Sequence, residues 1–97
     1  MYKVILVCQS GMSSSFIVKA IKKAFDAHNE EIEIHAHAAM ELVDFIGEVD
    51  TVLIAPNVLY MMSDIESTCQ EHHITPIVIP VQQYGQMDGE AIRKLII

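Results

Sequence analysis

A cysteine followed by small, uncharged residues is the part of this sequence best suited to chemistry. It reads Cys8-Gln9-Ser10-Gly11-Met12-Ser13-Ser14-Ser15 and comes directly after the apolar run Val4-Ile5-Leu6-Val7. Backbone N–H groups at the start of a helix have no intrahelical partner and bind anions, and glycine permits main-chain conformations that larger residues resist. The stretch therefore predicts a phosphate cradle without a side-chain cation, formed by Gly11 and the small serines around it.

Cys8 is the candidate nucleophile of this stretch. The N-terminus of a helix favours the thiolate form of a nearby cysteine, and the thiolate attacks electrophiles such as phosphorus. The functional interpretation is a phosphocysteine intermediate, and the structural one is a buried cysteine before a serine-rich helix start. The residues alone leave both interpretations open.

Cysteine-dependent phosphatases are the first alternative, because they also place a cysteine before a phosphate-binding loop. Their C-x5-R loop carries an arginine that clamps the phosphoryl oxygens. In this chain that position is Ser14, and no arginine precedes Arg93. Without the arginine and without an evident general acid, the loop is suited to hold a phosphoryl group and pass it on.

Redox and nucleotide chemistry fit the sequence less well. No C-x-x-C motif is present, and Cys8 and Cys69 lie far apart in a chain expected in the cytosol, where thiols stay reduced. A disulfide between them is therefore the weaker expectation. The loop has one glycine and no lysine, so it matches neither a dinucleotide fingerprint nor a Walker loop.

Apolar patterning predicts strands and helices that alternate along the chain. Residues 3–7 are almost wholly apolar, as in a strand covered on both faces, whereas residues 30–38 alternate as in an edge strand. Pro76 and Pro80 flank a fourth apolar run, which suits the ends of a strand. We expect strands at residues 3–7, 30–38, 50–55 and 76–80, helices at 13–28, 40–47 and 58–72 (the last regular or irregular), a loop at 82–89 and a short final helix.

This order of elements indicates parallel βαβ units with right-handed crossovers. We predict one α/β domain over residues 1–97, an open four-stranded parallel sheet with helices on both faces. Such a three-layer sandwich is flavodoxin-like or cysteine-phosphatase-like. Ligands bind at the carboxyl ends of its strands where the strand order reverses, and the loop after the first strand is the expected place.

The charge of the chain indicates which partners are disfavoured, and its hydropathy indicates where in the cell we expect it. A net charge of −7 on 97 residues disfavours nucleic acid, because a phosphate backbone would be repelled. No apolar run approaches the about 18 residues of a membrane span, and the start of the chain lacks the features of a signal peptide. We expect a soluble, cytoplasmic protein.

The histidines raise the question of a metal site. His35 and His37 share one face of the second strand, and Cys69, His72 and His73 cluster at the end of a predicted helix. Neither set has a third ligand at a suitable spacing, so solvated surface histidines are the expected role. We predict no metal and no cofactor.

Three blocks of the sequence resemble one family, the enzyme IIB component of the sugar phosphotransferase system, lactose/cellobiose (chitobiose) type. They are similar to its first strand and phosphorylated loop, its third strand with the following loop, and the segment before its final helix. The blocks keep the family's order and span nearly the whole chain. They are Val4-Ile5-Leu6-Val7-Cys8 with Ser10-Gly11-Met12-Ser13-Ser14-Ser15, Asp50-Thr51-Val52-Leu53-Ile54-Ala55-Pro56-Asn57 with Tyr60-Met61, and Tyr84-Gly85 with Met87-Asp88-Gly89.

The resemblance implies that Cys8 accepts a phosphoryl group from a phosphohistidine of the IIA partner. Cys8 then gives the group to a sugar of the cellobiose, lactose or chitobiose class during uptake through the membrane component IIC. The protein would be a protein-phosphocysteine–sugar phosphotransferase, associated through IIC with the inner face of the membrane. By position, residues 9–15 would hold the phosphate, with Asn57, Tyr60 and Tyr84 beside them.

One departure and two alternatives accompany the resemblance. Gln9 stands where small residues are common in the family, which bears on loop detail or partner choice. A non-catalytic IIB-like module that binds or regulates a partner is the alternative from another class, and a cysteine-dependent phosphatase is the third hypothesis.

Overall fold

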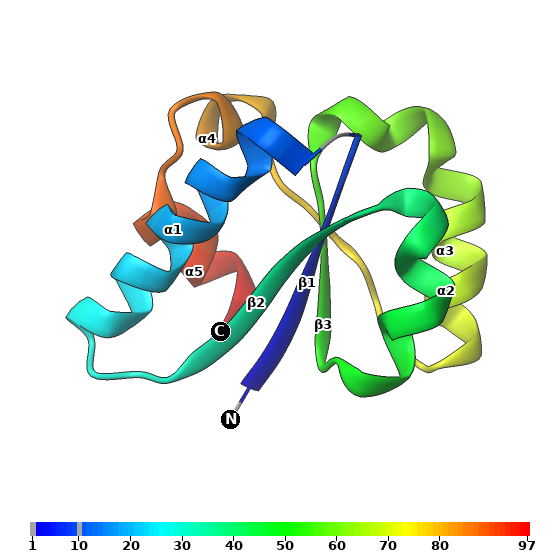
Figure 1. The fold of residues 1–97 in the computed structure, drawn as a ribbon, viewed down its shortest axis with the longest axis horizontal. Helices are drawn as coiled ribbons and strands as arrows, with labels where there is room; N and C mark the ends of the chain where they lie inside the picture. The colour runs from blue at the N-terminus through cyan, green and yellow to red at the C-terminus, as the bar shows by residue number, and fades with distance from the viewer. Residues whose placement is uncertain (1, 10) are drawn as a thin grey trace.

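The chain folds around one parallel β-sheet (Figure 1). The computed structural model describes residues 2–9 and 11–97, and for residues 11–14 it describes the main chain only. Within these residues four parallel strands pair in the order β2-β1-β3-β4. They are β1 (Tyr2–Cys8), β2 (Ile32–Ala38), β3 (Thr51–Ile54) and β4 (Ile77–Val78). The predicted four-stranded parallel sheet is confirmed, with β2 at its predicted edge.

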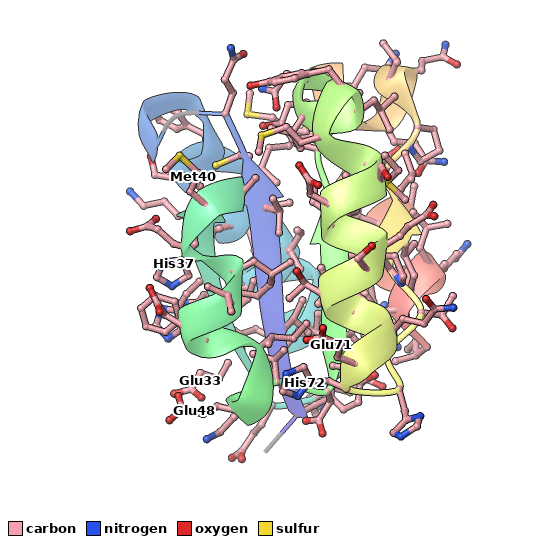
Figure 2. The ribbon with its side chains drawn as sticks, turned by 90° about the vertical axis from the view of Figure 1, so that its right-hand side faces the viewer. Glu33, His37, Met40, Glu48, Glu71 and His72 are labelled. Atoms are coloured by element: carbon pink, nitrogen blue, oxygen red, sulfur yellow. The ribbon has the colours of Figure 1, made fainter. Side chains whose placement is uncertain are left out.

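Helices cover both faces of the sheet, which confirms the predicted three-layer α/β fold (Figure 1). On one face α1 packs against α5, and on the other α2 lies beside α3, the face that Figure 2 shows. No helix in the described ranges is long and apolar enough to cross a membrane. The helices are α1 (Gly11–Ala27), α2 (Leu42–Phe45), α3 (Met62–Glu71), α4 (Val81–Gly85) and α5 (Gly89–Ile96), with the 3₁₀ segments η1 (Ala39–Glu41), η2 (Ile46–Glu48) and η3 (Pro56–Met61).

The central strand β1 sends alternate side chains into two hydrophobic cores. Val4, Leu6 and Cys8 belong to the core shared with α1 and α5. Ile5 and Val7 belong to the core shared with α2 and α3. Each of these five residues is at most 1% exposed. Burial on both faces explains why the strand is an unbroken apolar run rather than an alternating one.

The strand order reverses between β1 and β3. From β1 the chain passes through α1 to β2, and from β2 it passes through α2 to β3 on the other side of β1. The carboxyl ends of β1 and β3 thus form the topological switch point, where open α/β sheets bind ligands. The loop after β1 lies there, as predicted.

Helix α1 begins at Gly11, earlier than the predicted start near Ser13. The first turn consists mainly of small residues, and these contribute little to the apolar periodicity from which the start was predicted. The helix therefore follows β1 with only Gln9 and Ser10 between them, which brings its N-terminus close to the end of the strand.

The prediction of a loop over residues 82–89 is wrong. A one-turn helix, α4, follows Pro80, and α5 already begins at Gly89. Tyr84 of α4 packs against the core, and the Asp88 carboxylate caps α5 by accepting a hydrogen bond from the Ala91 N–H at 3.1 Å. A helix of one turn has too few residues to show a helical period in the sequence.

The helix predicted over residues 58–72 is irregular, which confirms one of the two alternatives. Val58 has non-helical dihedral angles (φ −117°, ψ 17°), so η3 bends there and α3 begins only at Met62. The bend changes which side chains face the core. Val58 is buried, whereas Leu59, which the periodicity assigned to the apolar side, is 44% exposed.

The helix predicted over residues 40–47 exists as the three short pieces η1, α2 and η2. Leu42 and Ile46 are buried in the core over β1, whereas Met40 and Val43 are 82% and 65% exposed. The segment thus covers the centre of the sheet and leaves a groove beside the edge strand β2.

Candidate functional site

The Cys8 thiol lies at the last position of the central strand, on the side of the sheet that α1 covers. The residue is 1% exposed. Its Sγ lies 3.8 Å from the main-chain oxygen of His37, to which the thiol donates a hydrogen bond. A thiol is a weak donor, so the contact orients the group more than it stabilises it. Access to Sγ is therefore governed by the residues around it.

The loop after β1 is tied to the loop after β3. The main-chain N–H of Gln9 donates to the side-chain oxygen of Asn57 over 3.3 Å. Residues 11–14 then form the first turn of α1, and Ser15 follows on this helix with an exposed side chain. The first N–H groups of an α-helix have no intrahelical partner, and its start carries the positive end of the helix dipole, so the end of α1 that follows Cys8 is suited to attract an anion.

Part of the predicted phosphate cradle lies outside the described residues. This applies to Ser10 as a whole and to the side chains of Met12, Ser13 and Ser14.

A small cavity of about 100 Å³ opens beside Cys8. Its walls come from the segments that follow β1, β2 and β3, and Tyr60, which is 72% exposed, stands at its edge. No charged side chain lines it among the described residues, so nothing in its wall repels a dianion. The lining residues are Cys8, Gln9, Ala38, Ala39, Met40, Val58, Tyr60 and Met61.

The three residues predicted beside the phosphate occupy different places. Asn57 contacts the loop after Cys8 directly, and Tyr60 lines the same cavity as the thiol. Tyr84 is half-buried on α4 and packs against the core cluster that contains Cys8, but it is not among the residues that line the cavity. The structure thus brings Asn57 and Tyr60 to the loop and cavity beside Cys8, and it packs Tyr84 against the core to which Cys8 belongs.

The only arginine of the sequence is engaged far from Cys8. The Nε of Arg93 donates to the Glu30 carboxylate at 2.7 Å, and its guanidinium lies 5.7 Å from the centre of the Phe25 ring. Phe25 is in the last turn of α1, roughly 20 Å from the start of that helix at a rise of about 1.5 Å per residue. Arg93 therefore does not reach the cavity. Its hydrogen bond instead lowers the pKa of the Glu30 carboxyl below the ordinary value.

The two cysteines lie in different cores. Cys8 belongs to the cluster under α1, whereas Cys69 belongs to the cluster under α2 and α3, on the opposite face of the sheet. The sheet separates them, so they do not form a disulfide. Burial, and next the Glu66 carboxylate, raise the pKa of the Cys69 thiol, which makes it a poor nucleophile.

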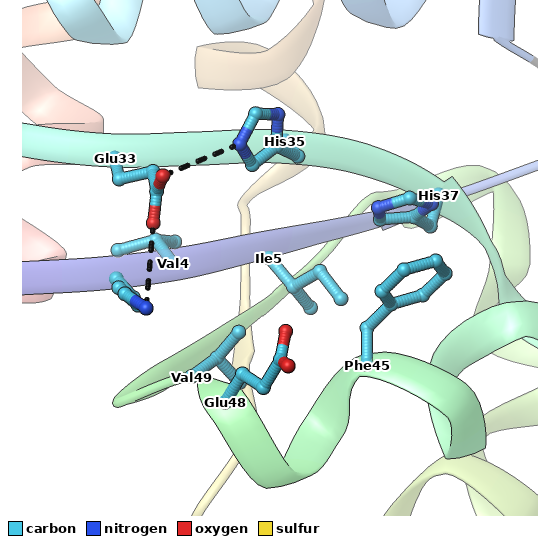
Figure 3. Close-up of a pocket in the computed structure, with 9 residues that line it drawn as sticks. Val4, Ile5, Glu33, His35, His37, Phe45, Glu48 and Val49 are labelled. Atoms are coloured by element: carbon cyan, nitrogen blue, oxygen red, sulfur yellow. Dashed lines mark ion pairs between the residues drawn. The ribbon is translucent and has the colours of Figure 1, made fainter.

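A second concavity, a groove of about 370 Å³, lies between β2 and the α2 segment (Figure 3). Glu33, His35 and His37 face it from β2, which confirms that the two histidines share one face of the strand. The Glu33 carboxylate lies 3.9 Å from His35 Nε2 and 3.8 Å from Lys3 Nζ. Glu33 thus contacts two of the other residues that line the groove.

The prediction that both histidines are solvated surface residues is wrong for His37. Its side chain is only 22% exposed, against 63% for His35. The His37 ring stacks on the ring of Phe45, with the centres 4.0 Å apart and the planes 17° from parallel. Sequence reasoning missed this contact, because Phe45 approaches only when the chain turns back over the sheet.

No set of three or more histidine, cysteine or acidic side chains in the described part of the chain is arranged to hold a metal ion. This holds for the groove as well as for the cavity beside Cys8.

Comparison with known proteins gives consistent matches over nearly the whole chain. A model of the family described as "PTS system, Lactose/Cellobiose specific IIB subunit" matches residues 3–95. The oligo-beta-mannoside-specific EIIB component of Bacillus subtilis (strain 168) is 32% identical over 90 residues, which cover 93% of this chain and 87% of that protein. The cellobiose-specific EIIB component of Lactococcus lactis subsp. lactis (strain IL1403) is 26% identical over 92 residues, 90% of this chain and 85% of that protein.

Two solved structures share the fold. The cellobiose-specific phosphotransferase IIB component from Borrelia burgdorferi superposes with a TM-score of 0.81 at 31% identity and covers 97% of this chain and 86% of its own. The lactose-specific IIB domain from Streptococcus pneumoniae has a TM-score of 0.85 at 15% identity and covers 98% and 93%. At 15% identity the second likeness concerns the fold alone.

Proposed function

Because the chain belongs to the lactose/cellobiose-specific IIB family of the sugar phosphotransferase system, we propose that Cys8 carries the phosphoryl group in transit. The observation that carries this proposal is the position of the thiol. It ends the central strand next to the N-terminus of α1 and opens on a cavity that no charged side chain of the described residues lines. The nucleophile thus lies beside a helix N-terminus that can bind an anion.

The first step is transfer from a phosphohistidine of a IIA partner. The Cys8 sulfur attacks phosphorus, the S–P bond forms and the N–P bond breaks. The proton of the thiol passes to the imidazole nitrogen that leaves. Because the partner supplies the base that takes the proton, the IIB chain needs no acid–base residue of its own beside Cys8.

The second step passes the group to a sugar hydroxyl at the membrane component IIC. The S–P bond breaks, an O–P bond forms, and the hydroxyl proton restores the thiol. We place residues 1–97 as one domain at the cytoplasmic side of IIC. The sugar belongs to the cellobiose, lactose or chitobiose class, which is supported by the lactose/cellobiose description of the family and by the cellobiose-specific relative.

Residues 9–15 are proposed to hold the phosphoryl oxygens, mainly through main-chain N–H groups at the start of α1. Asn57 supports this role because it fixes the Gln9 main chain. Tyr60 at the cavity edge is placed to contact the group or the partner, and Tyr84 supports the core that contains Cys8.

The location of Arg93 favours a carrier over a phosphatase. Hydrolysis at a phosphocysteine is accelerated by a clamping arginine, and the single arginine of this chain is held by Glu30 near the far end of α1. A phosphocysteine without that clamp survives long enough to meet an acceptor.

The test is incubation with phosphorylated IIA protein of a lactose/cellobiose-type system, followed by intact mass. We expect one phosphoryl adduct on the unaltered chain and on Cys69→Ala, and none on Cys8→Ser. Membrane vesicles that contain the matching IIC should remove the adduct only when its sugar is added.

Three other outcomes would contradict the proposal. An adduct that survives in Cys8→Ser places the group elsewhere. Binding to IIA without any adduct supports the non-catalytic module, and steady turnover of an aryl phosphate supports a phosphatase.

A further inference from the structure

We propose that His37 is a positioning residue for Cys8, which acts through the main chain that forms one wall of the thiol's cavity. The proposal rests on the proposed function only where phosphoryl transfer is measured. The access of reagents to Cys8 tests it independently.

The main chain at His37 is in direct contact with the site. Its carbonyl oxygen accepts the hydrogen bond of the Cys8 thiol at 3.8 Å. The next three residues, Ala38, Ala39 and Met40, line the cavity beside that thiol. A displacement of the chain at His37 would therefore move both the acceptor of the thiol proton and the wall above it.

The side chain of His37 is held by two residues that follow it. Its ring stacks on Phe45 of α2, and its Nδ1 lies 3.6 Å from the Glu41 carboxylate. The same carboxylate oxygen accepts a hydrogen bond from the Ala38 N–H at 2.9 Å. We call His37, Glu41 and Phe45 the His37 clamp. It closes the turn from β2 into η1 and α2, and residues 38–40 lie within that turn.

His35 provides a matched control in the same chain. It lies two positions earlier on β2, faces the same groove and also has a carboxylate neighbour (Figure 3). That neighbour, Glu33, is on β2 itself at 3.9 Å. The His35 side chain, 63% exposed, therefore does not tie the strand to the wall of the cavity.

Charged groups surround the clamp. The His37–Glu41 contact is an ion pair when the imidazole is protonated. The other charged or titratable groups that line the groove are Lys3 on β1, Glu33 and His35 on β2, and Glu48 on η2.

The experiment measures alkylation of Cys8 by iodoacetamide with Cys69 as an internal reference. Peptide mass spectrometry quantifies the two sites separately. Cys69 is 0% exposed in the opposite core, so its modification reports global opening. In His37→Gln we expect the ratio of Cys8 to Cys69 modification to rise about three- to tenfold through local opening of the wall. In His35→Gln the ratio should stay unchanged.

A second readout separates positioning from general destabilisation. Phosphoryl transfer from IIA should slow about tenfold in His37→Gln although its thiol is more accessible, because alignment is lost. In His35→Gln transfer should stay within about twofold.

The proposal is overturned if His37→Gln and His35→Gln give the same Cys8 ratio. It is also overturned if Cys8 and Cys69 modification rise together, since that indicates global unfolding. Failure of the unaltered chain to accept phosphate would instead reject the proposed function, and the alkylation ratio would still decide the role of His37.

Discussion

The Gln9 N–H donates to Asn57 Oδ1 over 3.3 Å, and this bond joins the loops that leave β1 and β3. Those strands are neighbours at the point where the strand order reverses. Cys8 directly precedes Gln9, so the bond fixes the path of the chain between the thiol and the start of α1. Asn57 thereby contributes to the shape of the site.

Asn57→Ala removes this acceptor. We expect a loss of stability of about 0.5–1.5 kcal/mol, the usual range for one hydrogen bond, and phosphorylation of Cys8 slowed about tenfold by the misplaced loop. Asn57→Asp is the matched variant, because it keeps an acceptor oxygen but brings a negative charge toward a phosphoryl dianion. This variant should keep the stability of the unaltered chain, but its Cys8 should still be phosphorylated slowly. Phosphorylation of Asn57→Asp at the unaltered rate would contradict this account.

Gly89 is required by the contact between α1 and α5. A Cβ at this position would lie 2.2 Å from the main-chain oxygen of Ala20, which cannot move without distorting α1. Gly89→Ala should therefore cost about 1–3 kcal/mol or more, as for other overpacked sites. Gly47→Ala is the control, since nothing lies within 4 Å of its added Cβ. Equal urea midpoints for the two variants would refute the requirement.

The Glu30–Arg93 pair should make the free energy of unfolding depend on pH in the acid range. The Arg93 hydrogen bond lowers the pKa of the folded-state Glu30 carboxyl, so its contribution is present above the unfolded-state pKa of about 4.3. It is lost as the pH falls through the lower folded-state value. Glu30→Gln should thus be less stable than the unaltered chain at pH 6 and equal to it near pH 2. Glu31→Gln, on an exposed side chain, should show no such difference in urea midpoint.

Cys69 should produce the opposite dependence at high pH. Burial raises the folded-state pKa of its thiol, so its contribution is complete below the unfolded-state value of about 8.5. It declines as the pH rises further, because the unfolded chain ionises first. The advantage in unfolding free energy of the unaltered chain over Cys69→Ala should shrink between pH 8 and pH 10. An advantage that stays constant over this range would be inconsistent with the raised pKa.

The sequence predicts the layers of this fold well because their signals are local. The unbroken apolar run in β1 and the alternation in β2 identify a central and an edge strand. The irregular elements are less predictable. The bend at Val58 and the one-turn helix α4 depend on how the chain packs against distant residues, and neither spans enough residues to show a period.

The candidate site also has features that the sequence predicts and features that it does not. Residue types alone single out Cys8 and its loop as a candidate site, because a thiol before a small-residue helix start could attack and hold a phosphoryl group, but they leave the structural interpretation open. Asn57 was found only through the family resemblance, since its contact with Gln9 spans two strands. The enclosure of His37 by Phe45 and Glu41 has no counterpart in the sequence pattern, in which His35 and His37 look alike.

The central claim is that Cys8 carries the phosphoryl group, and site-resolved mass spectrometry of the chain after reaction with phosphorylated IIA tests it most directly. The account predicts that the phosphoryl group resides on the Cys8 peptide alone, with fragments that assign it to sulfur. A phosphoryl group on Ser15, on His37 or on any other residue, or no group at all, would contradict the account.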